Sequence, residues 1–435
     1  MEDPLPAAYV DPESYLQDPA FHRTTTYALD RASGPLTVSY AVAGSADSNA
    51  PVVVWINGMG GHRLAACLLD GKFAATGVRL VTIDRPSAGK STPVPLGDRV
   101  RLSHEALLAV LAAEDITRFS LLSHSNGVIY TLYTLLHLPE RFAVPSWTLS
   151  SPWVPPFLSG SALLSIASWI PTPLTARLGG FVAGLQRVLG PLDAGLGWST
   201  GVVRGMSEWS SGFVSMGTHA SPAATSAAEV SSRRGQEEDA AMSPSSASSS
   251  TAIAETPTPP ELLTPEKQRE RFRRNNAKRP YHKQLFGGEY VPPGLFTDGM
   301  KIALAEGLDS MGQEAMLCLR QGDGANWGWF DSSPDERQNN EKQLYARGFE
   351  RLRSAVQRSG RPLRMSVWYG TEDGLIPQRG REYLQRLLCS ELGMVPDDNW
   401  HEIKGAGHDD ALGLTCVIEP FLEQVIEAHA SIDSA

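Results

Sequence analysis

Apolar runs alternate with segments of helical periodicity in the first third of the chain. Short strands are predicted near Thr24–Leu29 and at Leu36–Ala43, where apolar positions alternate with polar or small ones. The uninterrupted apolar runs Val52–Ile56 and Val78–Ile83 are typical of strands buried on both faces. Because helical segments follow such runs, the pattern predicts a mostly parallel sheet flanked by helices.

Three helices are predicted between these strands and after them. The first spans roughly His62–Thr76, and the second spans Ser103–Glu114, with Ser103 as its N-cap. A third, at Gly127–His137, follows an apolar strand and a sharp polar turn. The strand Trp147–Ser150 continues the alternation.

The alternation stops after Ser151, where prolines break it, and resumes only at the apolar strand Arg364–Tyr369. A helix at Arg379–Leu392, a short strand at Trp400–Ile403 and a helix from about Asp410 to Ala428 close the chain. The sequence therefore predicts one sheet whose two parts are separated by a long insertion.

We divide the chain accordingly into a first part of the core (1–151), an inserted lid (152–345) and a second part of the core (346–435). Within the insertion, the stretch 216–263 is rich in Ser, Ala, Thr and Pro. It carries too few large apolar residues to offset the entropy of ordering, so we expect it to be disordered. The apolar segment 161–190 predicts short amphipathic helices, and helix is predicted again at Leu295–Arg320.

Charge and cysteine content narrow the classes of function. The 435 residues carry a net charge of −10, which argues against a general nucleic-acid binder. Four scattered cysteines form no CxxC pair, so neither a metal site nor a disulfide framework is expected, and the thiols are expected to be buried and reduced. The acidic N-terminus is not a signal peptide, and no run is long enough to span a membrane. We therefore expect a cytoplasmic protein.

One segment is basic, although the chain as a whole is acidic. Residues 266–283 carry eight Lys or Arg residues against two Glu. The favoured interpretation is a solvated helix face with Pro265 in its first turn. The alternative is an anion-binding patch, and this segment or the lid would then make weak contact with a membrane surface.

Residues 119–130 carry the first candidate for chemistry. Ser125 lies at the turn between an apolar strand and a helix, beside N–H groups that favour negative charge. The pattern around it approaches the Gly-x-Ser-x-Gly of a nucleophile elbow, with Ser123 in place of the first glycine and Gly127 as the second. The alternative is an ordinary turn with a capping serine.

A serine nucleophile needs a base, and the base needs an orienting acid. Asp373 follows the late apolar strand, and His408 follows the last short strand, in a glycine-rich loop. Strand ends of an open α/β sheet gather at one edge, so these side chains are expected near Ser125. Glu372 is a weaker alternative to Asp373 as the acid.

A glycine-rich turn, 57–61, follows the strand Val52–Ile56 and could aim a backbone N–H at an oxyanion. The N–H groups of Met59 and Asn126 form the natural pair of donors. Gly58 belongs to the same turn, and we assign it to substrate binding.

In their order along the chain (57–61, Ser125, Asp373, His408), these four motifs resemble those of the α/β-hydrolase family, at its lid-bearing, esterase- and lipase-like end. The resemblance covers 24–151 and 363–429, about half the chain. It implies the α/β-hydrolase fold, with Ser125 as nucleophile, Asp373 as acid and His408 as base. It also implies backbone donation from Met59 and Asn126. Residues 84–91 resemble the family's Asp-x-x-Gly-x-Gly-x-Ser turn, with serine in place of the first glycine.

The expected activity is hydrolysis of apolar or acyl-chain esters through an acyl-enzyme, and this chemistry requires no metal or organic cofactor. The partner is then a small apolar ester, and no nucleic acid. The same triad also serves thioesterases, aminopeptidases, carbon–carbon hydrolases and acyltransferases. A non-catalytic binding protein is the alternative from another class.

Neighbouring residues have less specific interpretations. His124 is expected to pack beside the nucleophile, with a lesser chance of touching substrate. Asp409 and Asp410 are expected to start the final helix, where carboxylates suit the helix dipole. Trp327 and Trp329 are expected to pack within the lid rather than to form a substrate wall.

Overall fold

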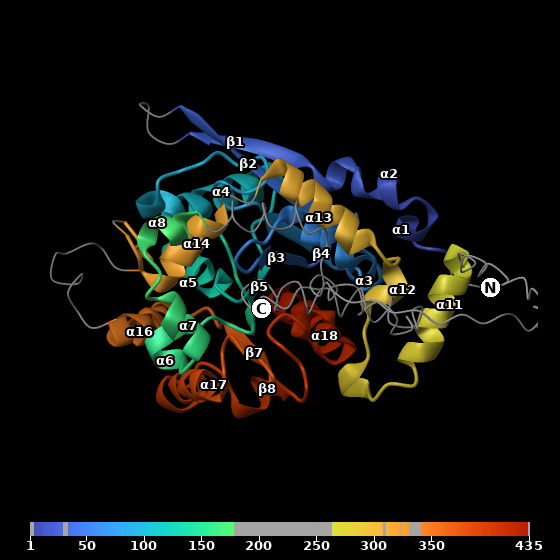
Figure 1. Cartoon of the computed structure of the whole chain (residues 1–435). Helices are drawn as coiled ribbons and strands as arrows, with labels where there is room; N and C mark the ends of the chain where they lie inside the picture. The colour runs from blue at the N-terminus through green and yellow to red at the C-terminus, as the bar shows by residue number, and fades with distance from the viewer. Residues whose placement is uncertain are drawn as a thin grey trace, which may run out of the picture.

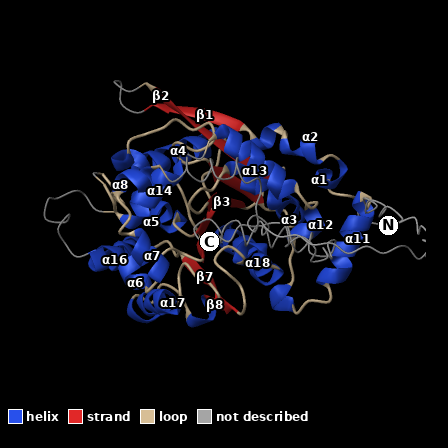
Figure 2. Ribbon diagram, in the orientation of Figure 1, coloured by secondary structure: helices blue, strands red, loops and turns tan. Residues whose placement is uncertain are grey.

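Eight strands form one sheet through the centre of the molecule (Figures 1 and 2). The computed structural model describes residues 4–28, 34–177, 263–307, 310–322, 324–329 and 341–433. The strands are β1 (Arg23–Ala28), β2 (Pro35–Gly44), β3 (Val52–Ile56), β4 (Arg79–Ile83), β5 (Ser120–His124), β6 (Ser146–Ser150), β7 (Arg364–Gly370) and β8 (Trp400–Ile403).

The sheet has the order β1-β2-β4-β3-β5-β6-β7-β8. Strand β2 runs antiparallel to β1 and β4, and every other neighbouring pair is parallel. The carboxyl ends of β3, β5, β6, β7 and β8 therefore meet at one edge. This arrangement confirms the predicted mostly parallel sheet and brings the loops after these strands together.

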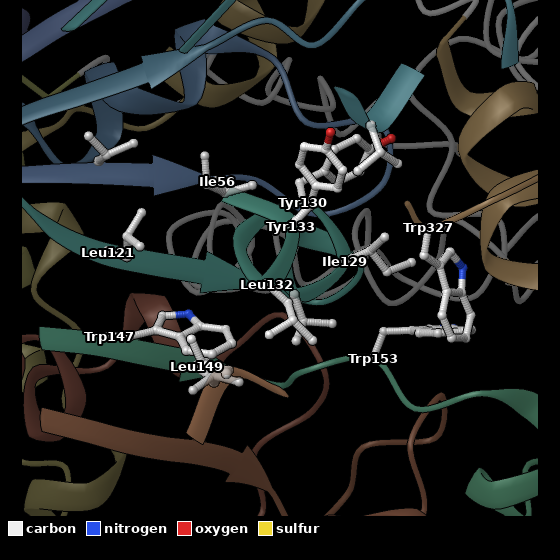
Figure 3. Packing of buried hydrophobic residues seen from close by; sticks show 14 of the residues in the cluster. Ile56, Leu121, Ile129, Tyr130, Leu132, Tyr133, Trp147, Leu149, Trp153 and Trp327 are labelled. Atoms are coloured by element: carbon white, nitrogen blue, oxygen red, sulfur yellow. The ribbon is translucent and has the colours of Figure 1, made fainter. Parts of the chain in front are cut away.

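Alternate residues of the central strands enter two separate hydrophobic clusters. In β3, Val54 and Ile56 pack into one cluster, whereas Val53 and Trp55 pack into the other. Figure 3 shows part of the first cluster, to which β5 contributes Leu121. A strand buried on both faces needs apolar residues at every position, which explains the uninterrupted apolar runs.

Helices cover both faces of the sheet (Figure 1). The first cluster holds side chains of α4 (Arg99–Ala113), α5 (Gly127–His137), α16 (Glu341–Ser359) and α17 (Gln378–Gln385). The second cluster holds side chains of α2 (Pro12–Leu16), α3 (Asp70–Ala75), α13 (Leu295–Glu306) and α18 (Thr415–Asp433). The short helix α1 (Ala7–Val10) precedes α2.

Several predicted helix boundaries were wrong. Helix α4 begins at Arg99, four residues early, and Ser103 is not its N-cap, because the Ser103 hydroxyl donates to the carbonyl of Arg99. The helix predicted at His62–Thr76 is a 3₁₀ segment, Arg63–Leu68, followed by α3. The last helix, α18, starts at Thr415 rather than near Asp410.

The insertion contributes helices to two places. Helices α6 (Pro156–Ser159), α7 (Ala162–Ala167), α8 (Thr172–Ala176) and α14 (Ser310–Leu319) gather near α5 (Figure 1). The short helices predicted in 161–190 are confirmed as far as residue 177. The stretch 216–263, predicted to be disordered, lies outside the described residues except for Leu263.

Residues 285–295 of the insertion pack against the core, away from α6, α7, α8 and α14. Phe286, Val291 and Leu295 share a cluster with Phe421 of α18. Helix α12 (Gly287–Tyr290) is held by the Tyr9 hydroxyl, which donates to the carbonyl of Gly288. Residues 285–295 are thus part of the core in space, although the insertion carries them in sequence.

The basic segment begins with helix α11 (Pro265–Asn276), and Pro265 lies in its first turn as predicted. Some of its charge is used inside the protein. Arg269 is buried and donates to the carbonyl of Pro4 at 3.0 Å. Arg273 forms an ion pair with Glu289 at 2.7 Å. Among the described helices, none combines the length and apolar character needed to cross a bilayer.

Candidate active site

Ser125 occupies a sharp turn between β5 and α5. Its φ of 50° lies in the left-handed region, which a non-glycine residue adopts only when the surroundings enforce it. The next helical residue must be small, because a Cβ on Gly127 would lie 2.4 Å from the carbonyl oxygen of Ile56. Ser123 fits the place of the missing glycine, and its hydroxyl accepts a hydrogen bond from Trp147 Nε1 at 2.9 Å. The turn has the geometry of a nucleophile elbow.

The structure brings Ser125, His408 and Asp373 into one hydrogen-bonded chain. His408 Nε2 lies 2.9 Å from Ser125 Oγ, and His408 Nδ1 lies 2.7 Å from Asp373 Oδ2. A carboxylate only accepts, so Nδ1 carries the proton and Nε2 is free to accept the serine proton. All three residues are buried.

Asp373 is held by its own loop. Its other oxygen, Oδ1, accepts the N–H groups of Leu375 at 2.9 Å and Ile376 at 2.7 Å. Both carboxylate oxygens therefore have partners, which keeps the charge aimed at the imidazole. Glu372 is exposed, and its neighbour Asp373 makes the bond to His408.

The pKa of His408 reflects two opposing effects. Burial alone would lower it, but the charge of Asp373 and the hydrogen bond to that carboxylate raise the pKa of His408 to about 9. Asp409 and Asp410 add smaller effects in the same direction. The imidazolium form is therefore well stabilised, as a base that receives a proton during reaction requires.

The loop after β3 lies directly against Ser125. A Cβ on Gly58 would lie 2.9 Å from His124 Cδ2 and 3.2 Å from Ser125 Cβ, so a side chain here would force these neighbours to move. Within the part of the chain that the structure describes, the N–H groups of Met59 and Asn126 have no hydrogen-bond acceptor. Unpaired N–H groups beside a serine hydroxyl are suited to an oxyanion.

His124 is paired within the protein. Its Nε2–H donates to Asp409 Oδ1 at 2.8 Å, and its ring lies 5.2 Å from that of His408, centroid to centroid. The expectation that Asp409 starts the final helix is wrong, because the loop turns this side chain back toward His124. Asp410 instead accepts from the N–H of Gly407 and precedes a 3₁₀ turn.

A cavity of about 250 Å³ lies near the elbow, between residues 155–169 and 318–327 of the insertion, and no residue of the elbow lines it. It is lined mainly by apolar groups, namely Pro155, Pro156, Phe157, Ser165, Ser168, Trp169, Cys318, Leu319, Arg320 and Trp327. Trp153 links the cavity to the elbow, since its N–H donates to the carbonyl of Ser125 at 3.0 Å and its ring meets Trp327 edge-on (Figure 3). Cys318, in the cavity wall, lies next to the side chain of Asn126.

The two tryptophans of the insertion differ in their surroundings. Trp329 is almost fully buried, and its Nε1–H donates to the carbonyl of Ile129 at 3.0 Å, as expected for packing. Trp327 is also buried among aromatic rings, but one side of it forms part of the cavity wall. The expectation of simple lid packing therefore describes Trp329 better than Trp327.

Among the residues that the structure describes, two groups of side chains have the composition of metal ligands. In the first, His124, His408 and Asp409, both ring nitrogens of His408 are already bonded, to Asp373 and Ser125. The second consists of His62, Asp84 and Glu306. There the guanidinium of Arg63 bonds both carboxylates and supplies the positive charge. Neither group presents a ready ligand set.

Two charged residues to which no motif in the sequence assigns a role lie beside the glycine-rich loop 57–61. Arg85 follows β4, and Glu314 belongs to α14 in the insertion. They form a buried ion pair although 229 residues separate them. No local sequence pattern predicts a contact between segments so far apart in the chain.

No protein-family model and no curated protein sequence matches the chain. Solved structures do. A protein described as a candidate lipase, from Acinetobacter baumannii, aligns at a TM-score of 0.50 and 12% identity over 99% of this chain and 100% of its own. An epoxide hydrolase from Vigna radiata aligns at 0.46 and 12%, over 96% and 99%. A thermophilic esterase from Thermogutta terrifontis aligns at 0.45 and 11%, over 93% and 99%.

The chain has the α/β-hydrolase fold. The sheet order and the likeness to the Acinetobacter protein show this together. Identities this low show the fold alone, and one fold carries many reactions. The reaction must therefore be argued from the side chains at the strand ends.

Proposed function

We propose that the protein is a serine hydrolase that cleaves carboxylic esters through an acyl-enzyme intermediate. One observation carries the proposal. Ser125, His408 and Asp373 form a continuous hydrogen-bonded chain at a strained turn, next to two N–H groups without acceptors. This combination gives a nucleophile, a base, an orienting acid and an oxyanion site.

In the first step, His408 Nε2 takes the proton of Ser125 while Oγ attacks the ester carbonyl carbon. The carbonyl oxygen becomes an oxyanion between the N–H groups of Met59 and Asn126. His408 then gives the proton to the leaving alkoxide, and the carbon–oxygen bond breaks. Water attacks the acyl-enzyme with His408 again as base, which releases the carboxylic acid and restores Ser125.

The cavity near the elbow supports apolar acyl groups as substrates. Its walls are mainly aromatic and aliphatic, and Trp169 at its outer side is 87% exposed. Each buried methylene contributes about 0.8 kcal/mol to binding, so longer acyl chains should bind more tightly until the cavity is filled.

The test is a series of p-nitrophenyl esters with acetyl, butyryl, octanoyl and palmitoyl chains, combined with mass spectrometry of the quenched enzyme. We expect an acyl adduct on Ser125, and kcat/KM for the octanoyl ester should exceed that for acetyl by roughly tenfold or more. Ser125→Ala should form no adduct. A preference for acetyl or charged esters would contradict the substrate class. Matched thioesters and anilides separate ester hydrolysis from other uses of the triad.

A further inference from the structure

A buried cluster of three charges lies directly behind the glycine-rich loop 57–61, which we call the oxyanion loop. Glu314 is 1% exposed and bonds Arg85 twice, with Nε–Oε1 at 2.6 Å and Nη2–Oε2 at 2.7 Å. Arg99 Nη2 donates to the same Oε1 at 2.9 Å. We call Glu314, Arg85 and Arg99 the Glu314 cluster. Two of its members come from the core and one from the insertion.

The cluster is bonded to the oxyanion loop on two sides. Arg85 donates to the carbonyl of Asn57 through Nη1 and to the carbonyl of Gly58 through Nη2, the latter at 2.6 Å. Glu314 Oε2 accepts the N–H of Gly60 at 3.3 Å. The two residues before Met59 and the one after it are therefore held by one buried ion pair.

The bond from Arg85 also decides where the Met59 N–H points. The carbonyl of Gly58 and the N–H of Met59 belong to one trans peptide unit, in which they point in opposite directions. A guanidinium on the carbonyl side therefore turns the N–H away from Arg85. A charged donor on the carbonyl also polarises the amide, which makes its N–H a stronger donor.

The net charge of the Glu314 cluster also favours an oxyanion beside the Met59 N–H. Burial would raise the pKa of Glu314, but the charges of Arg85 and Arg99 lower it to about 2, so the carboxylate is ionised. One negative and two positive charges leave an excess positive charge close to the loop. Arg85 is further fixed by the ring of Tyr130, 4.7 Å from its guanidinium carbon.

We propose that Arg85 and Glu314 are positioning residues that hold and polarise the Met59 N–H of the oxyanion site. Helix α14, which carries Glu314, is therefore part of the catalytic framework. This inference rests on the proposed function, because it assigns a role in the same reaction.

The test compares Arg85→Lys and Glu314→Gln with wild type. Arg85→Lys keeps the charge but loses the fork that spans two carbonyls, and Glu314→Gln keeps the shape but loses the charge. Loss of a whole oxyanion donor costs roughly 10²–10³ in kcat, so a misplaced donor should cost about 10- to 100-fold. KM should change by less than about threefold, because the effect concerns the transition state.

Two further readouts separate positioning from simple destabilisation. The pH dependence of kcat/KM should keep its wild-type midpoint in both variants, because His408 and Asp373 are untouched. Affinity for a trifluoromethyl ketone, which forms an oxyanion on Ser125, should fall in proportion to kcat/KM.

Glu114 provides a matched control. It is also a carboxylate with two arginine partners, Arg23 and Arg79, and its side chain is only 6% exposed. It lies before the start of β5, at the opposite edge of the sheet from Ser125. Glu114→Gln should lower thermal stability and leave kcat within about twofold of wild type.

The outcomes are distinguishable. Wild-type kcat in folded Arg85→Lys and Glu314→Gln, with Ser125 still acylated, would overturn this inference alone. An equal loss of kcat in Glu114→Gln would also overturn it, because the effect would then be general destabilisation. Absence of acylation in wild type would overturn the proposed function together with this inference.

Discussion

Two histidine–carboxylate pairs lie side by side at the carboxyl edge of the sheet. His408 bonds Asp373 at 2.7 Å, and His124 bonds Asp409 at 2.8 Å. The ring centroids are 5.2 Å apart. His124 is the last residue of β5, and the other three residues follow the ends of β7 and β8. By distance alone the pairs are equivalent.

The two pairs differ in the further hydrogen bonds that each histidine and each carboxylate makes. The second nitrogen of His408 reaches Ser125, and the second oxygen of Asp373 accepts two backbone N–H groups. His124 Nδ1 and Asp409 Oδ2 have no hydrogen-bond partner among the described residues. A histidine does not become a catalytic base merely because a carboxylate lies at hydrogen-bond distance. Its other ring nitrogen must also reach a nucleophile.

The largest expected effect is a difference in kcat between variants of the two histidines. His408→Ala should lower kcat by roughly 10⁴–10⁶-fold, because the serine loses its base. His124→Ala should lower it by less than about tenfold, since His124 does not contact Ser125. Initial rates with an activated ester measure both. A large loss in folded His124→Ala would show that the second pair takes part in the reaction.

The next largest effect is a difference in kcat between variants of the two carboxylates. Asp373→Asn should lower kcat by roughly 10³–10⁴-fold, because the amide leaves the imidazole in the wrong tautomer and its cation unsupported. Asp409→Asn should change kcat by less than about threefold. Burst kinetics with saturating ester give kcat for each variant. Similar losses in both would mean that the two pairs share the catalytic task.

A smaller effect concerns the pH profile. Only neutral His408 accepts the serine proton, so kcat/KM should rise with pH through the pKa of about 9. Asp409→Asn removes a charge that raises this pKa, so the rise should shift to lower pH. His124→Asn should shift it less, since the charges that raise the pKa of His408 are those of Asp373, Asp409 and Asp410. If the pH profile of Asp409→Asn matched that of wild type, the charge of Asp409 would not raise the pKa of His408 as we expect.

The smallest expected effect is on stability. The pKa of His408 is raised in the folded state, so protonation stabilises the fold. This contribution is complete below the unfolded pKa of about 6.5 and is lost as pH rises through about 9. The free energy of unfolding should therefore fall over this range in wild type and in His124→Asn, but less in His408→Ala. Urea titrations at several pH values test this difference.

The core could be predicted because its signals are local. The apolar runs of β3 and β5 report burial on both faces, and α5 begins and ends at the predicted residues, Gly127 and His137. Ser125, Asp373 and His408 each follow a strand, so the topology of the sheet was enough to bring them together.

The errors arose where tertiary contacts outweigh local propensity. Ser103 looks like a cap, but α4 extends back to Arg99 because Arg99 is bonded inside the protein, to Glu314 and Tyr130. Asp409 suits a helix start, but His124 offers a stronger partner. Glu314 gave no signal at all, because its role depends on Arg85, which is distant in sequence.

The most direct test of the central claim is labelling with a fluorophosphonate, which reacts with activated serines, followed by peptide mapping. Wild type, Ser125→Ala and His408→Ala should be treated side by side. The proposed triad predicts label on Ser125 in wild type and none in either variant. A folded wild-type protein that stays unlabelled, or that is labelled equally in His408→Ala, would contradict it.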